Sequence, residues 1–160
     1  MMKKILFLFI SLILLQQITS AKALDGMVKF PRTNIIVSLE IADSDEEKTQ
    51  GLMSRENLPE KRGMVFIFNP IRTVTFWMKD TLIPLDMIFI NRGKIVNIVK
   101  NAIPNQTSIL YPSGAEVSEV IEVNGGFSDK YSIKIGDTVI FENIPSIDYS
   151  QKSKLMIIEK

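Results

Sequence analysis

Short apolar runs separated by turn residues dominate residues 27–141. Runs of about four to eight residues bounded by Gly, Pro, Asn or Asp are typical of strands, whose side chains alternate between two faces. The pattern therefore predicts a mainly β fold, a compact antiparallel barrel or sandwich with one or two short helices. We expect strands at 27–30, 35–41, 64–68, 74–78, 85–90, 94–100, 117–123, 133–135 and 138–141.

Two segments carry helix signals. Ser44 is followed three residues later by Glu47, the spacing of a capping box, and acidic residues crowd the first turn where the helix dipole favours them. We expect a short surface helix that ends at Gly51, and a second short helix at 127–131. Residues 101–115 lack periodicity and are predicted to form a long loop over one end of the sheet.

The N-terminal residues have the pattern of a secretory signal peptide. Two lysines precede the apolar run 5–15, and Ala21-Lys22-Ala23 provides a small-residue cleavage site. The apolar run is shorter than the roughly 20 residues that a membrane span needs. We predict a signal peptide at 1–23, a domain at 24–144 and a C-terminal tail at 145–160, which indicates a periplasmic or secreted protein. An uncleaved N-terminal anchor is the alternative.

The composition limits the available chemistry, because the chain contains no Cys and no His. This removes disulfides, thiolate nucleophiles, imidazole bases and zinc sites built on either side chain. We therefore expect no cofactor and no metal. A copper site lined by methionines is the alternative, although methionine is also a common core residue. Its candidate ligands are Met53, Met64, Met78 and Met87.

The charge balance indicates no polyanionic partner. The whole chain has 19 basic and 18 acidic residues, and removal of residues 1–23 would take away three lysines, leaving 16 against 18. Nucleic-acid binding requires a basic surface, and membrane-surface binding requires a polybasic segment. We expect neither partner after signal cleavage, and we expect a monomer.

The stretch 76–90 contains the only Trp of the chain and joins two apolar runs through a polar corner. Asp86 lies in a strand that is apolar on both faces, so its buried carboxylate needs a partner. Arg55 and Lys79 are the cationic candidates. Asp80 starts a turn at this corner. These residues indicate either a small polar site or a structural turn held by one ion pair. The candidate site residues are Arg55, Trp77, Lys79, Asp80 and Asp86.

Four motifs that occur in order resemble those of the DUF192 family, a group of small bacterial and archaeal proteins without an established activity. They are 51–55 (GLMSR), 63–68 (GMVFIF), 76–86 (FWMKDTLIPLD) and 120–126 (VIEVNGG). The resemblance covers roughly 37–141 and implies a compact, mainly antiparallel β domain that is often exported. Asp80 stands where the family more often has Asn, and residues 101–111 lack a Cys that many members carry.

Three functions fit these observations. The first is a non-catalytic binding module for a carbohydrate or another small polar ligand, in which an exposed Trp77 stacks on a ring; Trp77 as a core residue is the alternative. The second is a hydrolase that uses Asp80 and Asp86, which requires two carboxyl groups across an open cleft. The third is a structural or interaction domain that binds a periplasmic protein and no small ligand.

Overall fold

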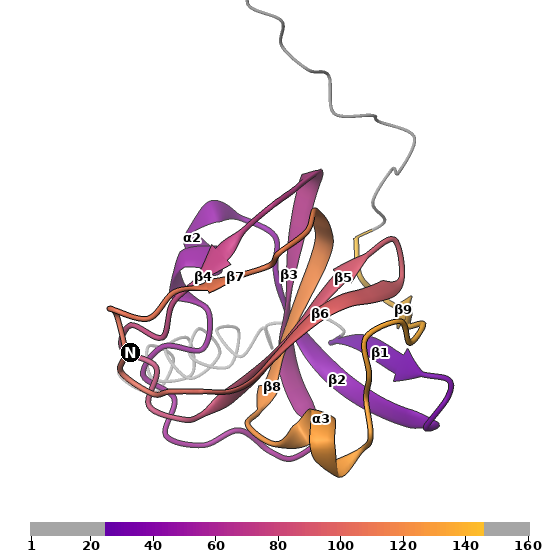
Figure 1. Ribbon diagram of the computed structural model, residues 1–160, viewed down its shortest axis with the longest axis horizontal. Helices are drawn as coiled ribbons and strands as arrows, with labels where there is room; N and C mark the ends of the chain where they lie inside the picture. Colours follow the sequence, from indigo (N-terminus) through magenta and orange to yellow (C-terminus); the bar gives the residue numbers. More distant parts are fainter. Residues whose placement is uncertain (1–24, 146–160) are drawn as a thin grey trace, which may run out of the picture.

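A computed structural model describes residues 25–145, which form a half-barrel of seven strands beside a two-stranded sheet (Figure 1). The mainly β prediction is confirmed. The predicted signal peptide and nearly all of the predicted tail lie outside the described residues. The large sheet has the order β6-β5-β8-β3-β2-β1-β9. Its strands are β1 (Gly26–Phe30), β2 (Ile35–Ala42), β3 (Arg62–Arg72), β5 (Leu85–Asn91), β6 (Lys94–Ala102), β8 (Val117–Asn124) and β9 (Ile140–Glu142).

The neighbouring strands of the large sheet are antiparallel, except that β2 and β3 run parallel. Parallel neighbours cannot be joined by a tight turn and need a connection of a dozen residues or more. Residues 43–61 form this connection, which contains helix α2 (Asp45–Gln50). The small sheet pairs β4 (Thr75–Phe76) with β7 (Tyr111–Pro112). In Figure 1, α2 and this small sheet lie on the same side of the half-barrel.

The central strands are buried on both faces, as predicted for residues 85–90. Val65 and Ile67 belong to one apolar core and Met64 and Phe66 to another, because successive side chains of β3 point to opposite faces. The first core continues into helix α3 (Phe127–Lys130) and the segment after it. The second core is completed by the 43–61 connection and by the segment that leads into β5.

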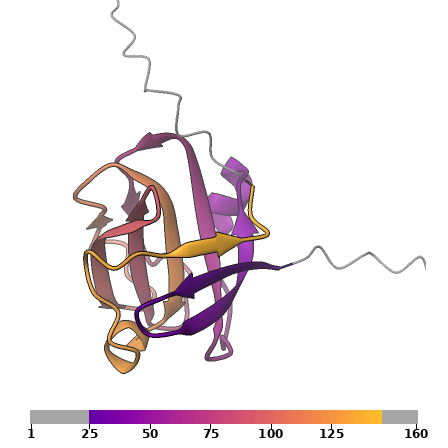
Figure 2. The same cartoon turned by 90° about the vertical axis from the view of Figure 1, so that its right-hand side faces the viewer.

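The C-terminal part of the domain differs from the prediction. Residues 133–135 form no strand, and only 140–142 of the final run does, as β9 paired with β1. Residues 136–139 instead form backbone hydrogen bonds with the start of β6, including Ile95 N–H to Asp137 O at 2.9 Å. The segment between α3 and β9 therefore runs from one edge of the sheet to the other, as the turned view shows (Figure 2). The prediction failed because this pairing joins residues about forty positions apart.

Strand lengths also differ in the middle of the chain. The run 74–78 contributes only the two residues of β4, and β3 continues past the expected end at residue 68 to Arg72, with a register shift against β8. The predicted long loop at 101–115 contains the short strand β7.

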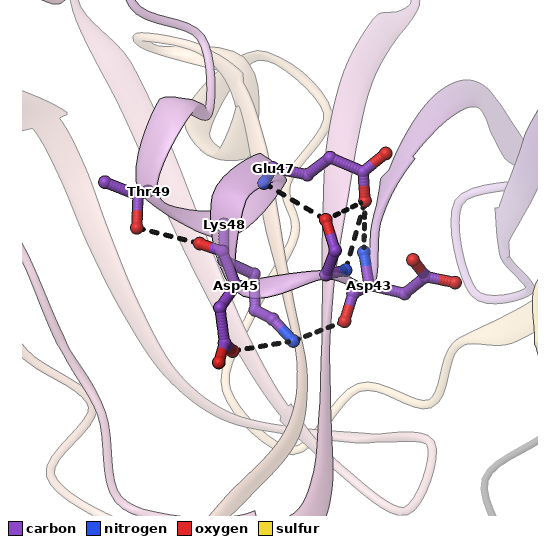
Figure 3. Close-up of polar contacts among 6 residues, drawn as sticks. Asp43, Asp45, Glu47, Lys48 and Thr49 are labelled. Atoms are coloured by element: carbon purple, nitrogen blue, oxygen red, sulfur yellow. Dashed lines mark hydrogen bonds and ion pairs between the residues drawn. The ribbon is translucent and has the colours of Figure 1, made fainter.

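The turn and the helix start that short-range sequence signals predicted are confirmed. The β5–β6 hairpin turns at Arg92 and Gly93, which have φ angles of 50° and 74°. Helix α2 begins at a complete capping box, in which the Ser44 hydroxyl accepts from the Glu47 amide and the Glu47 carboxylate accepts from the Ser44 amide (Figure 3). These bonds hold the pKa of Glu47 below its ordinary value. Among residues 25–145, no helix has the length and apolar character needed to cross a membrane.

Candidate functional site

Asp86 is fully buried, but its carboxylate binds backbone amides and not the expected cation. One oxygen accepts from the amides of Asn101 and Gly126, both at 2.9 Å, and the other accepts from the amide of Ser128 at 2.7 Å. The carboxylate thus fixes the start of α3 and ties it to the end of β6. The prediction of an ion pair with Arg55 or Lys79 is wrong. Backbone amides that have no other partner at a turn and at a helix start donate hydrogen bonds to the buried carboxylate and stabilise its charge in place of a cation.

Arg55 lies elsewhere and binds Glu40 of β2. Two parallel hydrogen bonds of 2.7 and 2.6 Å join the guanidinium to the Glu40 carboxylate. This geometry raises the pKa of Arg55 through the hydrogen bonds with Glu40. The pair lines a separate hollow of about 320 Å³, to which Gly51 also contributes. Arg55 therefore does not join the other predicted site residues, and its charge is already matched.

Trp77 and Lys79 do lie together. The Trp77 side chain is 45% exposed, so the interpretation of Trp77 as a core residue does not hold. The Lys79 ammonium is 5.6 Å from the centre of the Trp77 ring. Asp80 is exposed in the turn that follows, with a φ of 50°, and its carbonyl accepts from the Ser54 amide at 2.8 Å. Trp77, Lys79 and Asp80 thus form an exposed corner against the 43–61 connection.

A pocket lies beside this corner, with Trp77 at its edge. It encloses about 30 Å³, which is enough for one water-sized group. Aromatic side chains, the C-terminal part of α2 and the GLM motif surround it. The lining residues are Lys48, Thr49, Gln50, Gly51, Leu52, Met53, Phe66, Phe76, Trp77, Thr81 and Glu122.

Among residues 25–145, Glu122 is the one carboxylic acid that lines this pocket. It lies on the central strand β8, between Met64 of β3 and Met87 of β5, and is only 4% exposed. No hydrogen bond or ion pair to its carboxyl group is found among residues 25–145. Loss of hydration on burial raises the pKa of Glu122 to about 8, so the group is mainly a neutral acid at pH 7. A neutral carboxyl group offers one donor and one acceptor to whatever enters the pocket.

The wall opposite Glu122 requires glycine. Gly51 has a φ of 48° and a ψ of −133°, a conformation that other residues rarely adopt. A Cβ atom there would lie 3.3 Å from Cζ of Phe66 and 3.9 Å from Oε2 of Glu122. Because Gly51 has no side chain, the space in front of the Glu122 carboxyl group stays open.

Glu122 was not among the residues predicted from the sequence, although the sequence contains a signal. The run 117–123 has apolar residues on both faces, and Glu122 interrupts the face that Val120 shares. The same reasoning that selected Asp86 applies to Glu122. Its importance became visible only with the fold, because the pocket above it is built by a segment about seventy residues earlier.

Two larger hollows border the pocket region, but their polar groups are largely matched. The first holds the Arg55–Glu40 pair, and the second, of about 360 Å³, shares Glu40 and Glu47 with it. Both are more open than the pocket at Glu122. We therefore take the smaller pocket, with its unmatched buried acid, as the candidate site.

Comparison with known proteins places the chain in a family. The model of the DUF192 family, described as "Uncharacterized ACR", matches residues 28–141. The chain belongs to the DUF192 family. Both the buried Asp86 and the pocket acid Glu122 lie inside the matched region. The description of the DUF192 family names no activity.

Solved structures resemble this DUF192 domain along most of their length. A protein of unknown function from Novosphingobium aromaticivorans is 35% identical, with a TM-score of 0.67 and coverage of 72% of this chain and 83% of that one. A protein from Sinorhizobium meliloti, described as a "putative transcription regulator", is 30% identical, with a TM-score of 0.67 and coverage of 74% and 93%. No curated protein matches the sequence significantly.

Proposed function

We propose that this DUF192 protein is a non-catalytic binding module for a small polar ligand. The ligand packs against Trp77 and places one polar group in the pocket, where it meets Glu122. The observation that carries this proposal is the buried carboxyl group of Glu122, which has no hydrogen-bond partner among residues 25–145 and lines a small pocket beside an exposed indole ring. The pattern of residues 1–23 supports placing this function in the periplasm or outside the cell.

The composition of the pocket fits binding better than structural packing. Burial of an acid without a partner costs free energy, and folded proteins retain such groups mainly where they have a function. Aromatic side chains around a few polar groups are typical of small-molecule sites. Trp77, Phe66 and Phe76 supply the aromatic surface, and Glu122 supplies the polar group.

The hydrolase alternative has less support. It requires two carboxyl groups that both reach the substrate across a cleft. Asp86 is fully buried and its oxygens bind three backbone amides, whereas Asp80 is exposed on a turn. Glu122 has no second carboxyl group beside it in the pocket lining. We therefore do not assign a catalytic role to these acids.

The proposal is tested with the fluorescence of Trp77, which is the only tryptophan of the chain. A panel of monosaccharides and small aromatic or aliphatic molecules, each as the acid, the alcohol and the amine, is titrated into the protein. We expect at least one member to shift or quench the emission saturably and to raise the melting temperature, since a ligand that binds only the folded state stabilises it.

Two variants locate the binding. Glu122→Leu should abolish the response, because it removes the polar group at the pocket floor while retaining an apolar side chain of similar size. Glu142→Gln, at an exposed position on β9, serves as the control and should respond as the wild type does. If no member of the panel changes the emission or the melting temperature, or if Glu122→Leu binds like the wild type, the proposed site is wrong.

A further inference from the structure

We propose that the ligand carries a carboxylate, which accepts a hydrogen bond from the Glu122 carboxyl group and lies near Lys48 of the pocket lining. This inference rests on the proposed function and names the chemical class of its ligand. It follows from the polar group at the pocket floor, the charges around the mouth and the size of the enclosed space.

The floor of the pocket offers a donor. The strand neighbours of Glu122 are Met64 and Met87, which supply no charge, and no cation hydrogen-bonds with it among residues 25–145. With a pKa of about 8, the carboxyl group keeps its proton at neutral pH. It can therefore donate an O–H bond to a carboxylate oxygen, and hydrogen bonds to a charged acceptor are roughly twice as strong as neutral ones.

Among residues 25–145, Lys48 is the one cation that lines the pocket, and the lining holds no acid other than Glu122. Lys48 lines the pocket from α2, and its ammonium lies 5.8 Å from the centre of the Phe68 ring. The guanidinium carbon of Arg72 lies 5.3 Å from the same ring centre. Lys79 lies over Trp77. The Lys48 ammonium also donates to the Asp43 carbonyl at 2.6 Å and lies 3.8 Å from the highly exposed Asp45. The other acids near it are Asp43, Glu46 and Glu47 on the same segment and the exposed Asp80, none of which lines the pocket. Lys48 and Lys79 would repel an ammonium group of the ligand and would attract a carboxylate.

The size of the space determines which part of the ligand enters. About 30 Å³ admits one oxygen-bearing group and excludes a ring. The remainder of the ligand must therefore stay outside, where the half-exposed Trp77 provides a flat apolar surface. A six-membered sugar acid or a small aromatic acid has both parts, a flat body and a terminal carboxylate.

The proposal fixes the sign of the pH dependence. A carboxylate ligand needs the proton on Glu122 and its own charge, so its affinity should be constant from about pH 5, above the ordinary pKa of a carboxyl group, up to pH 8 and fall by up to tenfold for each pH unit above it. An ammonium ligand would need the ionised form, so its affinity would rise with pH until Glu122 has lost its proton. The two ligand classes thus predict opposite slopes.

The test compares three sugars that differ at a single carbon. D-glucuronate carries a carboxylate, D-glucose a hydroxyl and 6-amino-6-deoxy-D-glucose an ammonium group; benzoate, benzyl alcohol and benzylamine form a second set. Binding to the full protein is measured by calorimetry at pH values below and above 8. We expect the acid of at least one set to bind at least tenfold more tightly than its alcohol and amine.

Substitutions separate this hydrogen bond from a structural effect. Glu122→Gln keeps an N–H donor, so it should bind the acid and lose the fall in affinity above pH 8. Glu142→Gln, the exposed control, should keep the wild-type pH profile. Lys79→Gln should weaken acid binding several-fold, because it removes a cation beside Trp77.

The outcomes distinguish the two proposals. Tighter binding of the alcohol or the amine, or an affinity for the acid that does not fall above pH 8, overturns the carboxylate inference and leaves the binding site in place. Absence of binding by every member of both sets and of the wider panel overturns both proposals.

Discussion

At the scale of single residues, the burial of Glu122 makes the stability of the fold depend on pH. The ordinary pKa of this carboxyl group is 4.5, and burial raises it to about 8 in the folded protein. Between these values the folded state retains a proton that the unfolded chain has lost, so the free energy of unfolding decreases as pH rises. The stabilising contribution is complete below pH 4.5 and declines by about 1.4 kcal/mol per pH unit until pH 8.

Replacement of Glu122 by Gln should remove this slope. The variant should exceed the wild type in unfolding free energy by roughly 4 kcal/mol at about pH 8 and by less than about 1 kcal/mol at about pH 5, since only the wild type must lose a proton on unfolding. Urea unfolding followed by Trp77 fluorescence measures the difference. Glu47, Glu60 and Asp137 have lowered pKa values and titrate below this range. If the free energy of unfolding changed equally with pH in the variant and the wild type, Glu122 would be ionised in the folded protein.

Asp86 has a structural role that differs from that of Glu122. Its three amide partners connect β5, the end of β6 and the start of α3. Substitution by Asn would turn an NH₂ group toward backbone N–H donors and leave at least one of them unpaired. We expect Asp86→Asn to lower the free energy of unfolding by about 2–4 kcal/mol, measured by urea unfolding.

Asp80→Asn is the matched control for that substitution. Asp80 is exposed and has a φ of 50°, a conformation that Asn tolerates well. It should change the unfolding free energy by less than about 0.5 kcal/mol. Similar free energies of unfolding for both variants would mean that the buried Asp86 carboxylate contributes no more to stability than the exposed Asp80 carboxylate does.

At the scale of elements, the end of α2 determines the shape of the pocket. We expect Gly51→Ala to destabilise the fold by about 1–3 kcal/mol, because of its positive φ and the 3.3 Å approach to Phe66. The added methyl group also narrows the space that Glu122 faces, so ligand binding should weaken. Urea unfolding and the Trp77 titration measure the two effects separately.

Gly136→Ala controls for backbone strain alone. Gly136 also has a positive φ, of 89°, but a Cβ atom there would meet nothing within 4 Å. This variant should lose stability and keep wild-type ligand binding. Loss of binding in both variants would show that binding depends on overall stability and not on the pocket wall.

The sequence was most informative about elements whose signals lie within a few residues. The capping box at Ser44 and the turn at Gly93 both formed as predicted, because a side chain and the backbone that it contacts are adjacent in the chain. The partners of Asp86 and Arg55 were not predictable in this way. Each carboxylate or guanidinium had several chemically suitable partners, and only the strand order decided among them.

At the scale of the whole molecule, the sequence predicted the β class but not the parallel pair. Val37, Leu39 and Ile41 alternate as in any strand, and alternation carries no information about the direction of the neighbouring strand. The candidate site was found only in part for the same reason. Trp77 and Lys79 lie together beside the pocket, whereas Glu122 becomes relevant through the connection that covers its face of the sheet.

That parallel pairing of β2 and β3 has a consequence for how the family can diversify. The connection between them lies outside the hydrogen-bonded ladder, yet it contributes Lys48, Gly51 and Met53 to the pocket. Changes of length or composition in residues 43–61 can therefore alter the lining of the pocket while the sheet stays intact. Exchange of this segment between homologues should therefore give proteins that share one sheet and differ in the walls of this pocket.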